Sequence, residues 1–391
     1  MSRRFLLYIS LSAIIIIIGV GGVLVSRNAA VQDFLRARAA KAVVSDYVDN
    51  TVLKTLDLLV ANIEALHVAA KKLQANPSAG NLDAAARAWH AAHGTWMTAV
   101  AYLYGPAAQH DYHKRIATWP FDKVLVEHAL DLMEAGQLAV DSRYLREEEM
   151  SGLRGLYTIM YFLFRDGRPR EAAGIRSVEL SYLTAVTQAL LEDSIDFEAS
   201  WRGLEKLPPA RTAVLQAAGI QNRSAYAEEF KHPGTPTSRY ASISMPLQEV
   251  FQEITGVLED IVPLIGELRE TAEPGAPAYW DSLDPCADLL NQLRSVENAY
   301  LGGVNGSRGR SVSELVAGHD KVLDRLIKIS LAHTAYRIGA IRDLHGESSG
   351  KRELAVRVAE GELEKLTARV AMAIPLVVLD PAVRPYAAYI K

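Results

Sequence analysis

The sequence predicts an all-α protein, built as two tandem four-helix-bundle-like domains behind an N-terminal signal or membrane-anchor segment. Apolar residues recur at three- and four-residue steps over long stretches, which is the period of amphipathic helices. Runs of alternating β-branched residues bounded by turns are scarce, and such runs would indicate strands. Proline and glycine cluster at a few places and divide the chain into pieces of helix length.

Residues 1–30 are predicted to be a signal anchor or a signal peptide. Arg3 and Arg4 precede an uncharged apolar run from Phe5 to Val25. That length suits a spanning helix of ~20 residues, whereas the apolar part of a secretory signal has ~7–15 residues. The basic start favours an N-terminus that stays in the cytoplasm. We therefore expect the rest of the chain to be exported, with an uncleaved anchor favoured over a cleaved signal.

Residues 31–218 are predicted to form the first bundle. An apolar stripe through 31–75 indicates one helix, and a second helix ends at Gly105-Pro106. The segment 106–120 is expected to be a loop. Further helices are expected at about 121–135, 143–165 and 171–198, with a short one near 210–217.

Residues 219–240 are predicted to be a linker, because proline and glycine are concentrated there, as in His232-Pro233-Gly234-Thr235-Pro236. Residues 241–391 are predicted to form the second bundle. Its helices are expected at about 243–272, 282–301, 312–345 and 350–373, joined by short loops as in antiparallel bundles. A signalling receptor is disfavoured, because no later apolar stretch has the length of a second spanning helix.

Composition excludes several functional classes. Lys and Arg number 42 against 46 Asp and Glu, a net charge of −4, whereas a nucleic-acid-binding domain carries a basic patch. Nucleic acid is therefore not an expected partner. The single cysteine, Cys286, excludes a disulfide framework, a cysteine-rich zinc site and a cysteine-ligated cluster within one chain.

Ten histidines prompt a search for metal ligands. The groups with suggestive spacing are Glu64 with His67, His90 with His93, and His110 with Asp111 and His113. Catalytic zinc takes three protein ligands, and a helix carrying His-Glu-x-x-His is missing from the sequence. These histidines are therefore interpreted as solvated or capping residues, and His110, Asp111 and His113 stay weak metal candidates.

Several aromatic segments stand in an order that resembles the imelysin-like family. They are Trp89 to Pro106, the loop ending in Trp119-Pro120-Phe121-Asp122, Gly155 to Phe164, and Asn298 to Gly302. The resemblance covers about residues 40–375. It implies an exported bacterial protein of two helical bundles that is linked with iron uptake, in a family whose founding member was described as a metallopeptidase. The expected location is the periplasmic side of an inner membrane, either anchored or cleaved and periplasmic.

The family hallmark is Gly-x-His-x-x-Glu followed by a run similar to Tyr-Leu-Leu-Phe. Gly155 matches the glycine and Tyr161 begins the matching run, but Tyr157 stands at the histidine position and Met160 at the glutamate position. A phenol of pKa ~10 and a thioether do not replace imidazole and carboxylate for a divalent ion. This departure argues against an enzyme. No cofactor is predicted, and iron or zinc is the metal that a retained site would take.

The leading hypothesis is therefore a non-catalytic binding or accessory module in iron acquisition. Its expected partners are the membrane, through the N-terminal segment, and a small ligand or an envelope protein. The ligand pocket is expected where the 119–122 loop meets the Gly155 to Phe164 helix, lined by Trp119, Asp122, Gly155, Tyr157, Met160 and Tyr161. Two alternatives stay open: a metallopeptidase that uses His110, Asp111 and His113 as displaced ligands, and a structural envelope scaffold.

Overall fold

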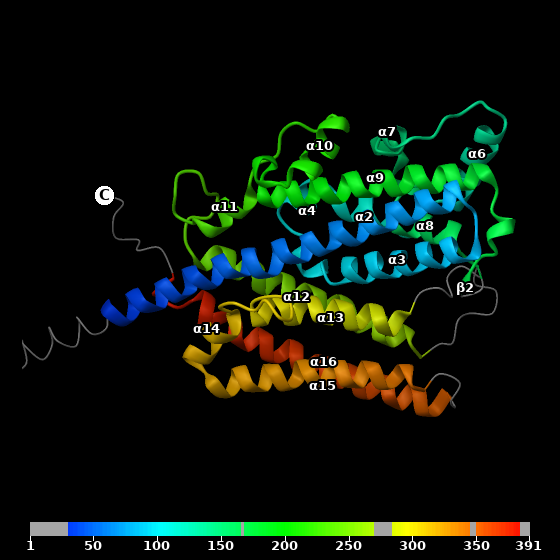
Figure 1. Ribbon diagram of the computed structural model, residues 1–391. Coiled ribbons are helices and arrows are strands. Elements are labelled where there is room, and N and C mark those ends of the chain that lie inside the picture. The colour runs from blue at the N-terminus through cyan, green and yellow to red at the C-terminus, as the bar shows by residue number, and fades with distance from the viewer. Residues whose placement is uncertain (1–29, 166–167, 270–283, 345–348, 384–391) are drawn as a thin grey trace, which may run out of the picture.

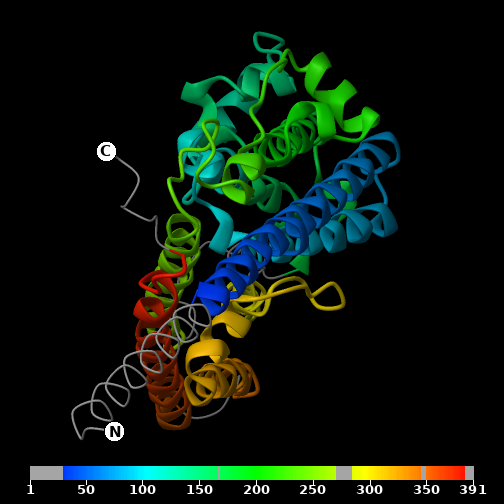
Figure 2. The same cartoon turned by 90° about the vertical axis from the view of Figure 1, so that its left-hand side faces the viewer.

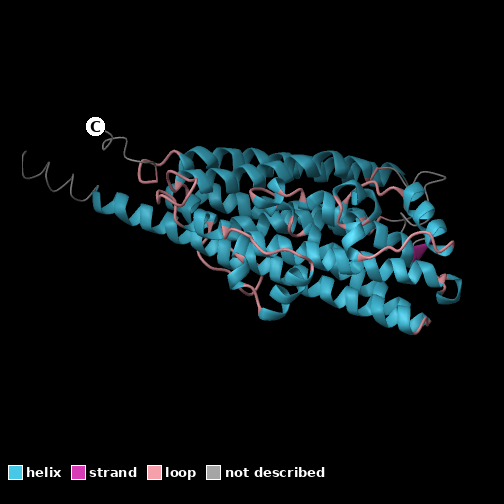
Figure 3. Cartoon of the chain, turned by 90° about the horizontal axis from the view of Figure 1, so that it is seen from above, coloured by secondary structure: helices cyan, strands magenta, loops and turns pink. Residues whose placement is uncertain are grey.

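The computed structural model describes residues 30–165, 168–269, 284–344 and 349–383. Helices dominate this part of the chain, and its strands are one short antiparallel pair, β1 (Phe164–Arg165) and β2 (Arg168–Pro169) (Figure 3). The all-α prediction is confirmed. Among these described residues no helix combines the length and apolarity needed to cross a membrane. The predicted signal or anchor lies outside them, except for residue 30.

The first bundle is a ring of four helices. α2 (Leu53–Ala75) packs between α9 (Ser177–Arg202) and α3 (Ala79–Met97), and α8 (Leu156–Leu163) closes the ring against α3 and α9 (Figure 1). Residues 30–46 are helical and continue through the π-helical stretch η1 (Tyr47–Val52) into α2. The chain therefore enters the bundle as one long rod.

Short helices surround this ring. They are η2 (Val100–Tyr102), α4 (Pro106–Gln109), α5 (Tyr112–Ala117), α6 (Lys123–Glu134), α7 (Ser142–Leu145), η3 (Glu148–Leu153), η4 (Ala172–Gly174), η5 (Leu204–Lys206) and α10 (Pro209–Ala217). The expected loop at 106–120 is thus partly helical. The prediction of a single helix at 143–165 is wrong, because the chain there forms three separate helices, α7, η3 and α8.

Gly155 explains where α8 begins. Its φ is +93°, in a region that residues with a side chain rarely adopt. A Cβ at this position would lie 2.7 Å from the carbonyl oxygen of Ile116 in α5. The backbone of α8 therefore starts in direct contact with α5, and only glycine allows this approach.

The central helix α9 carries acidic side chains at buried positions, where a core normally has apolar residues. Those in its C-terminal half are Glu192, Asp193, Asp196 and Glu198. Their arginine partners come mostly from the surrounding segments and are Arg115, Arg146, Arg154, Arg202, Arg211 and Arg223. Removing one member of such a buried pair leaves an uncompensated charge, which is strongly destabilising. The ion pairs therefore attach the outer segments to α9.

Asp193 and Asp196, both fully buried, share one arginine. Arg115 of α5 pairs with Asp193, and its Nη1 donates to Asp196 Oδ2 at 3.2 Å. Asp193 also meets Arg154 Nη1 at 3.3 Å, and Asp196 accepts from Arg223 Nη2 at 2.9 Å. Segments far apart in sequence thus meet at one point on α9.

The second bundle is also a four-helix ring, made by α12 (Ser244–Glu267), α13 (Pro285–Leu301), α15 (Lys321–Arg342) and α16 (Ser349–Val378). α12 packs on α13 and α16, and α15 also packs on α13 and α16. Figure 2 shows this bundle below the first one, with the rod leading into α2 between them. Contacts of α13 with α3, and of η2 with α12 and α13, join the two bundles.

The helix expected at 312–345 is two helices. α14 (Val312–His319) ends at Asp320, whose carboxylate accepts hydrogen bonds from the backbone N–H groups of Val322 and Leu323 at 2.9 and 3.0 Å. An aspartate in this role starts a new helix, so α15 begins at Lys321. The sequence pattern shows the apolar stripe but not this break.

The stretch 219–240, predicted to be a linker, carries the short helix α11 (Tyr226–Lys231). Its Tyr226 and Phe230 are buried, and so is Tyr240 just before α12. The Phe230 ring lies 5.3 Å from that of Tyr240 and 5.9 Å from that of Tyr47. Proline and glycine mark turns on either side of α11, and the aromatic residues of α11 together with Tyr240 anchor this otherwise largely exposed segment to the core.

Candidate functional site

The 119–122 loop meets α8 through aromatic contacts. The ring of Trp119 lies 4.6 Å from that of Tyr157, at 64° between the ring planes, and Trp119 remains 50% exposed. The ring of Phe121 lies 5.3 Å from that of Tyr161. Trp119 and Tyr157 are therefore the two predicted pocket residues that meet in a partly open place.

The other predicted pocket residues have their groups engaged within the protein. The Asp122 carboxylate caps α6 by accepting from Leu125 N–H at 3.0 Å. The hydroxyl of Tyr161 donates to Glu127, and Met160 is fully buried at 0% exposure. Gly155 contributes its close backbone approach to α5. Met160 thus occupies the core rather than lining an open surface.

His93 of α3 belongs to the same site. Its ring stacks on Trp89 at 4.8 Å and 13°, and it meets the ring of Tyr157 edge-on at 5.7 Å. Its Nδ1 lies 3.4 Å from Asp288 Oδ1 of α13, across the junction between the bundles. His93 is 4% exposed, so its interpretation as a solvated or capping residue is wrong.

A sequence signal for His93 exists in retrospect. The buried residues Leu82, Trp89 and Trp96 of α3 lie at seven-residue steps, and position 93 falls on the same apolar stripe, one turn after Trp89. A histidine on that stripe faces the core. Asp288 has no comparable local signal, because its role depends on how α13 packs on α3.

Burial moves the two groups toward their neutral forms. It lowers the pKa of His93 to about 4, and the nearby His90 lowers that pKa further. Burial raises the pKa of Asp288 to about 7, assisted by the negative charge of Asp284. A neutral imidazole therefore faces a carboxyl group that exchanges its proton near neutral pH.

The pH dependence of stability should reveal Asp288. The pKa of Asp288 in the folded state lies above the unfolded value of ~3.9, so the folded state binds this proton more tightly. Stability therefore falls as the pH rises from about 4 to about 7. Asp288→Asn removes this slope. We expect the variant to gain on the parent chain by as much as about 1.4 kcal/mol per pH unit over this window, measured from urea unfolding midpoints.

The exposed Asp131 of α6 offers the matched control, as Asp131→Asn. The unfolding free energy of this variant should stay within about 0.5 kcal/mol of the parent chain. The contribution of His93 to the pH dependence of stability has the opposite sign, because a lowered histidine pKa makes stability rise as the pH rises from about 4 to 6.5. A flat difference for Asp288→Asn would contradict the assignment.

The donors at the family's motif do not suit a divalent metal. Tyr157 presents a phenol whose pKa is raised by burial, and the thioether of Met160 is enclosed in the core. His93 adds one imidazole, which falls short of the three protein ligands of catalytic zinc. In the described ranges, three or more His, Cys, Asp or Glu side chains nowhere gather as a metal-holding group.

The weak candidates His110, Asp111 and His113 are likewise not gathered into such a group. Asp111 has a left-handed φ of +52° and pairs with Lys114 at 3.1 Å. His113 is exposed, while the ring of His110 lies 5.7 Å from that of Tyr112. Their closeness in sequence does not bring their ring nitrogens and carboxylate to one point.

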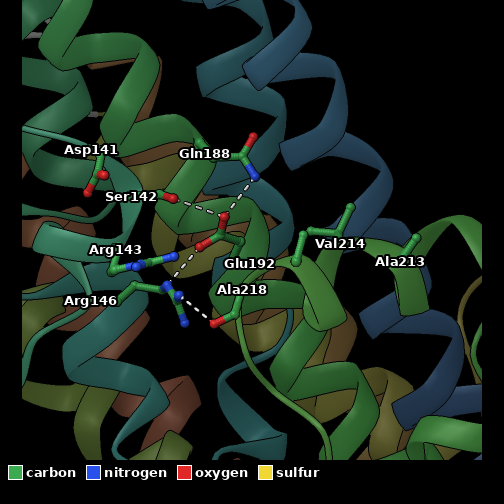
Figure 4. A pocket seen from close by; sticks show the side chains of 10 residues that line it. Asp141, Ser142, Arg143, Arg146, Gln188, Glu192, Ala213, Val214 and Ala218 are labelled. Atoms are coloured by element: carbon green, nitrogen blue, oxygen red, sulfur yellow. Dashed lines mark hydrogen bonds and ion pairs between the residues drawn. The ribbon is translucent and has the colours of Figure 1, made fainter.

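Two cavities lie away from the predicted pocket. One, of about 400 Å³, is bounded by α7, α9 and α10 (Figure 4). Its buried Glu192 accepts hydrogen bonds from Ser142 Oγ at 3.0 Å and Gln188 Nε2 at 2.9 Å, and it pairs with Arg146 Nε at 2.7 Å. These contacts satisfy the Glu192 carboxylate within the protein, so it is a wall group rather than an open ligand.

The other cavity, of about 390 Å³, lies beside α4 and α11. Its lining includes His110, Arg223, Tyr226 and Arg239. This is where the structure places His110. The sequence offers no pattern for this cavity, because its lining comes from four separate stretches of the chain.

Comparison with known proteins places the chain in a family. Iron-regulated protein A of Synechococcus elongatus is 23% identical over 260 residues, a match that covers 66% of this chain. The chain spans 64% of the length of that relative. A crystal structure from Parabacteroides distasonis, named as an iron-regulated protein A precursor, has a TM-score of 0.70 at 24% identity and covers 87% of this chain and 95% of its own.

An imelysin-like protein from Psychrobacter arcticum has a TM-score of 0.60 at 16% identity, over 85% of this chain and 93% of its own. These two likenesses concern the fold. The family model for imelysin matches residues 52–370, which includes the first helical ring, most of the second and the Tyr157 site. This chain therefore belongs to the imelysin family.

Proposed function

We propose that this imelysin-family chain is a non-catalytic binding module of iron acquisition. In this proposal it is exported and held at the periplasmic face of the membrane by its N-terminal segment. The observation that carries the proposal is the chemistry at the motif. Tyr157 packs between Trp119 and His93, and Met160 is buried in the core. Neither side chain supplies the imidazole or carboxylate that a hydrolytic metal requires.

Membership of the family gives the link to iron. The related proteins from Synechococcus elongatus and Parabacteroides distasonis carry the name iron-regulated protein A, which describes how those proteins respond to iron. A binding role also suits the half-exposed Trp119, since exposed aromatic side chains are frequent in contact surfaces. The partner is proposed to be a small ligand or an envelope protein.

A peptidase assay on the full chain, purified without a histidine tag, tests the non-catalytic role. We expect no cleavage of a peptide library, with or without added zinc. Chelator-sensitive cleavage that is lost in His113→Ala would instead support the displaced-ligand metallopeptidase. Metal that is lost on Tyr157→Phe would also contradict the proposal, because this variant removes only the hydroxyl and keeps the ring contacts with Trp119 and His93.

Native mass spectrometry of the same preparation separates a binding module from a scaffold. The proposal predicts a bound metal or small molecule in protein isolated from iron-limited cells, whereas the scaffold alternative predicts the bare chain. Fractionation tests the location. The full chain should be found in the membrane fraction and be cleaved by protease added to spheroplasts, and a protected chain in the cytosolic fraction would contradict export.

A further inference from the structure

The cavity of about 400 Å³ between α7, α9 and α10 lies apart from the place where Trp119 meets Tyr157 (Figure 4). We call it the α7–α10 cavity. Its volume is at the lower end of the range for small-molecule sites, ~300–1,000 Å³. Its lining combines four charged side chains with four small apolar ones, and the apolar ones all come from α10 and the residue that ends it. A ligand that fits this lining has both charged and aliphatic groups.

Glu192 and Arg146 form a fixed ion pair in the wall of this cavity. Arg146 Nε lies 2.7 Å from Glu192 Oε2, and Arg146 Nη2 donates to the Ala218 carbonyl oxygen at 2.9 Å. Glu192 Oε1 accepts from Ser142 and Gln188. These contacts use both Glu192 oxygens, whereas Arg146 Nη1 makes no hydrogen bond with the described residues. The pair is therefore preorganised, which lowers the cost of binding a ligand.

Arg143 supplies a second guanidinium group. It is exposed, lines the cavity and extends toward the pair of Glu192 with Arg146 (Figure 4). Across the residues that the structure describes, its side chain forms neither an ion pair nor a hydrogen bond. Arginine binds carboxylates through charge-assisted and frequently paired hydrogen bonds. The free donors of Arg143 and Arg146 therefore suit a carboxylate group of a ligand.

Asp141 adds an anionic acceptor to the same lining. Its Oδ1 caps α7 by accepting from Tyr144 N–H at 2.8 Å. Its Oδ2 has no hydrogen-bond donor in the described part of the chain, and the side chain is exposed. An ammonium group forms strong charge-assisted hydrogen bonds with such an oxygen. The cavity thus offers an acceptor for a cation as well as donors for an anion.

The charges of the lining sum to zero. Asp141 and Glu192 carry two negative charges, and Arg143 and Arg146 carry two positive ones. A ligand with only a carboxylate would leave the occupied cavity with a net negative charge, and one with only an ammonium group would leave a net positive charge. A zwitterion keeps the balance and avoids the cost of enclosing a net charge. The charge pattern therefore favours a ligand that carries both groups.

The wall contributed by α10 is small and apolar. Ala213 and Val214 lie on the opposite side of Glu192 from Asp141 and Arg143 (Figure 4). Covering this wall with a short aliphatic side chain removes apolar surface from water, which is favourable. The charged groups and the apolar wall thus face different parts of one small ligand.

We propose that the α7–α10 cavity binds a free α-amino acid with a short aliphatic side chain. Arg143 and Arg146 donate to its carboxylate, Asp141 Oδ2 accepts from its ammonium group, and the methyl groups of α10 cover its side chain. Glu192 acts through Arg146, which it holds in position. This site shares no residue with the Tyr157 site and goes beyond the proposed role in iron acquisition.

Isothermal titration calorimetry of the full chain with L-valine tests the site, and we expect one valine bound per chain. Two analogues separate the charged ends. Isovalerate lacks the ammonium group, isobutylamine lacks the carboxylate, and both keep the branched aliphatic group. Each analogue should bind at least about 10-fold more weakly than valine, because it loses hydrogen bonds between charged groups.

Two conservative variants assign these ends to residues. Arg143→Gln should weaken valine binding by at least about 10-fold and should not weaken the binding of isobutylamine, which has no carboxylate. Asp141→Asn should weaken valine binding by a similar factor and should not weaken the binding of isovalerate. Asparagine keeps the helix cap at this position. Arg87→Gln, which changes an exposed arginine of α3, is the matched control and should bind valine as the parent chain does.

Ala217→Trp provides a second test if either charge variant unfolds, and far-UV circular dichroism verifies the fold of each variant. Ala217 is an exposed residue of α10 in the lining, so a large side chain there should fill the cavity and abolish valine binding. A parent chain that binds no valine would overturn the inference. Equal affinities for valine and isovalerate, or a valine affinity unchanged in Arg143→Gln, would also overturn it.

The two proposals fail separately. Peptide cleavage would refute the non-catalytic role and leave valine binding at the α7–α10 cavity unaffected. A calorimetric titration without heat of binding would refute this site and leave the role in iron acquisition standing.

Discussion

Asp193→Ala is expected to lower the free energy of unfolding by about 3–5 kcal/mol. Asp193 is fully buried on α9 and pairs with Arg115 and Arg154. Arg115 keeps a second partner in Asp196. Arg154, which is 3% exposed, loses its ion pair with Asp193 and is left as a buried cation without an ion-pair partner among the described residues. Urea unfolding at constant m-value measures the loss.

Two further variants identify the cause. Asp193→Leu combined with Arg154→Met removes both charges and should be less destabilising than Asp193→Ala, because an apolar replacement of a whole buried pair is often neutral. Asp83→Ala removes an exposed aspartate of α3 and should stay within about 0.5 kcal/mol of the parent chain. If the double variant lost as much as the single one, the unpaired cation would not be the reason.

Trp89→Ala should have an effect of similar size, about 3–5 kcal/mol. The side chain is fully buried, and its Nε1 donates to the Leu156 carbonyl oxygen at 2.7 Å. It also packs on Phe164 at 5.2 Å and on His93 at 4.8 Å. The substitution therefore creates a large cavity, removes the hydrogen bond to the Leu156 carbonyl oxygen and removes the surface against which His93 stacks.

Trp119→Ala is the natural comparison, because it removes the same kind of side chain from the partly exposed place beside Tyr157. Trp119 is half exposed, so we expect a loss below about 1.5 kcal/mol, the upper range for an aromatic pair. Equal losses for the two variants would contradict the assignment of Trp89 to the core and of Trp119 to the surface. Thermal and urea unfolding of both variants provide the measurement.

Helix period was enough to predict the fold class, because each long helix buries one apolar stripe. Helix ends were harder to predict where the stop signal lies inside an apolar run. Asp320 divides α14 from α15 and Gly155 starts α8. Both act through a backbone contact that the apolar period does not report. Sequence reasoning therefore merged neighbouring helices at these two positions.

The sequence predicted one part of the candidate site and missed another. The contact of Trp119 with Tyr157 followed from the order of the aromatic segments, and the structure confirms that these rings meet. His93 and Asp288 escaped because they meet only when α3 packs on α13. The pairing of Asp193 with Arg115 joins residues 78 apart in sequence, and charged residues on a helix are normally assigned to its solvated face.

The arginine pairs of α9 also bear on how the first bundle opens. Short helices such as α5 and α7 are too short to be stable alone. Detaching α5 would expose the Arg115 guanidinium and leave Asp193 and Asp196 with one partner fewer. The backbone amides of α5 and α7 should therefore exchange with solvent hydrogen through large cooperative openings that include α9, rather than by local fraying. The outer shell and the central helix would then form a single unit of native-state opening.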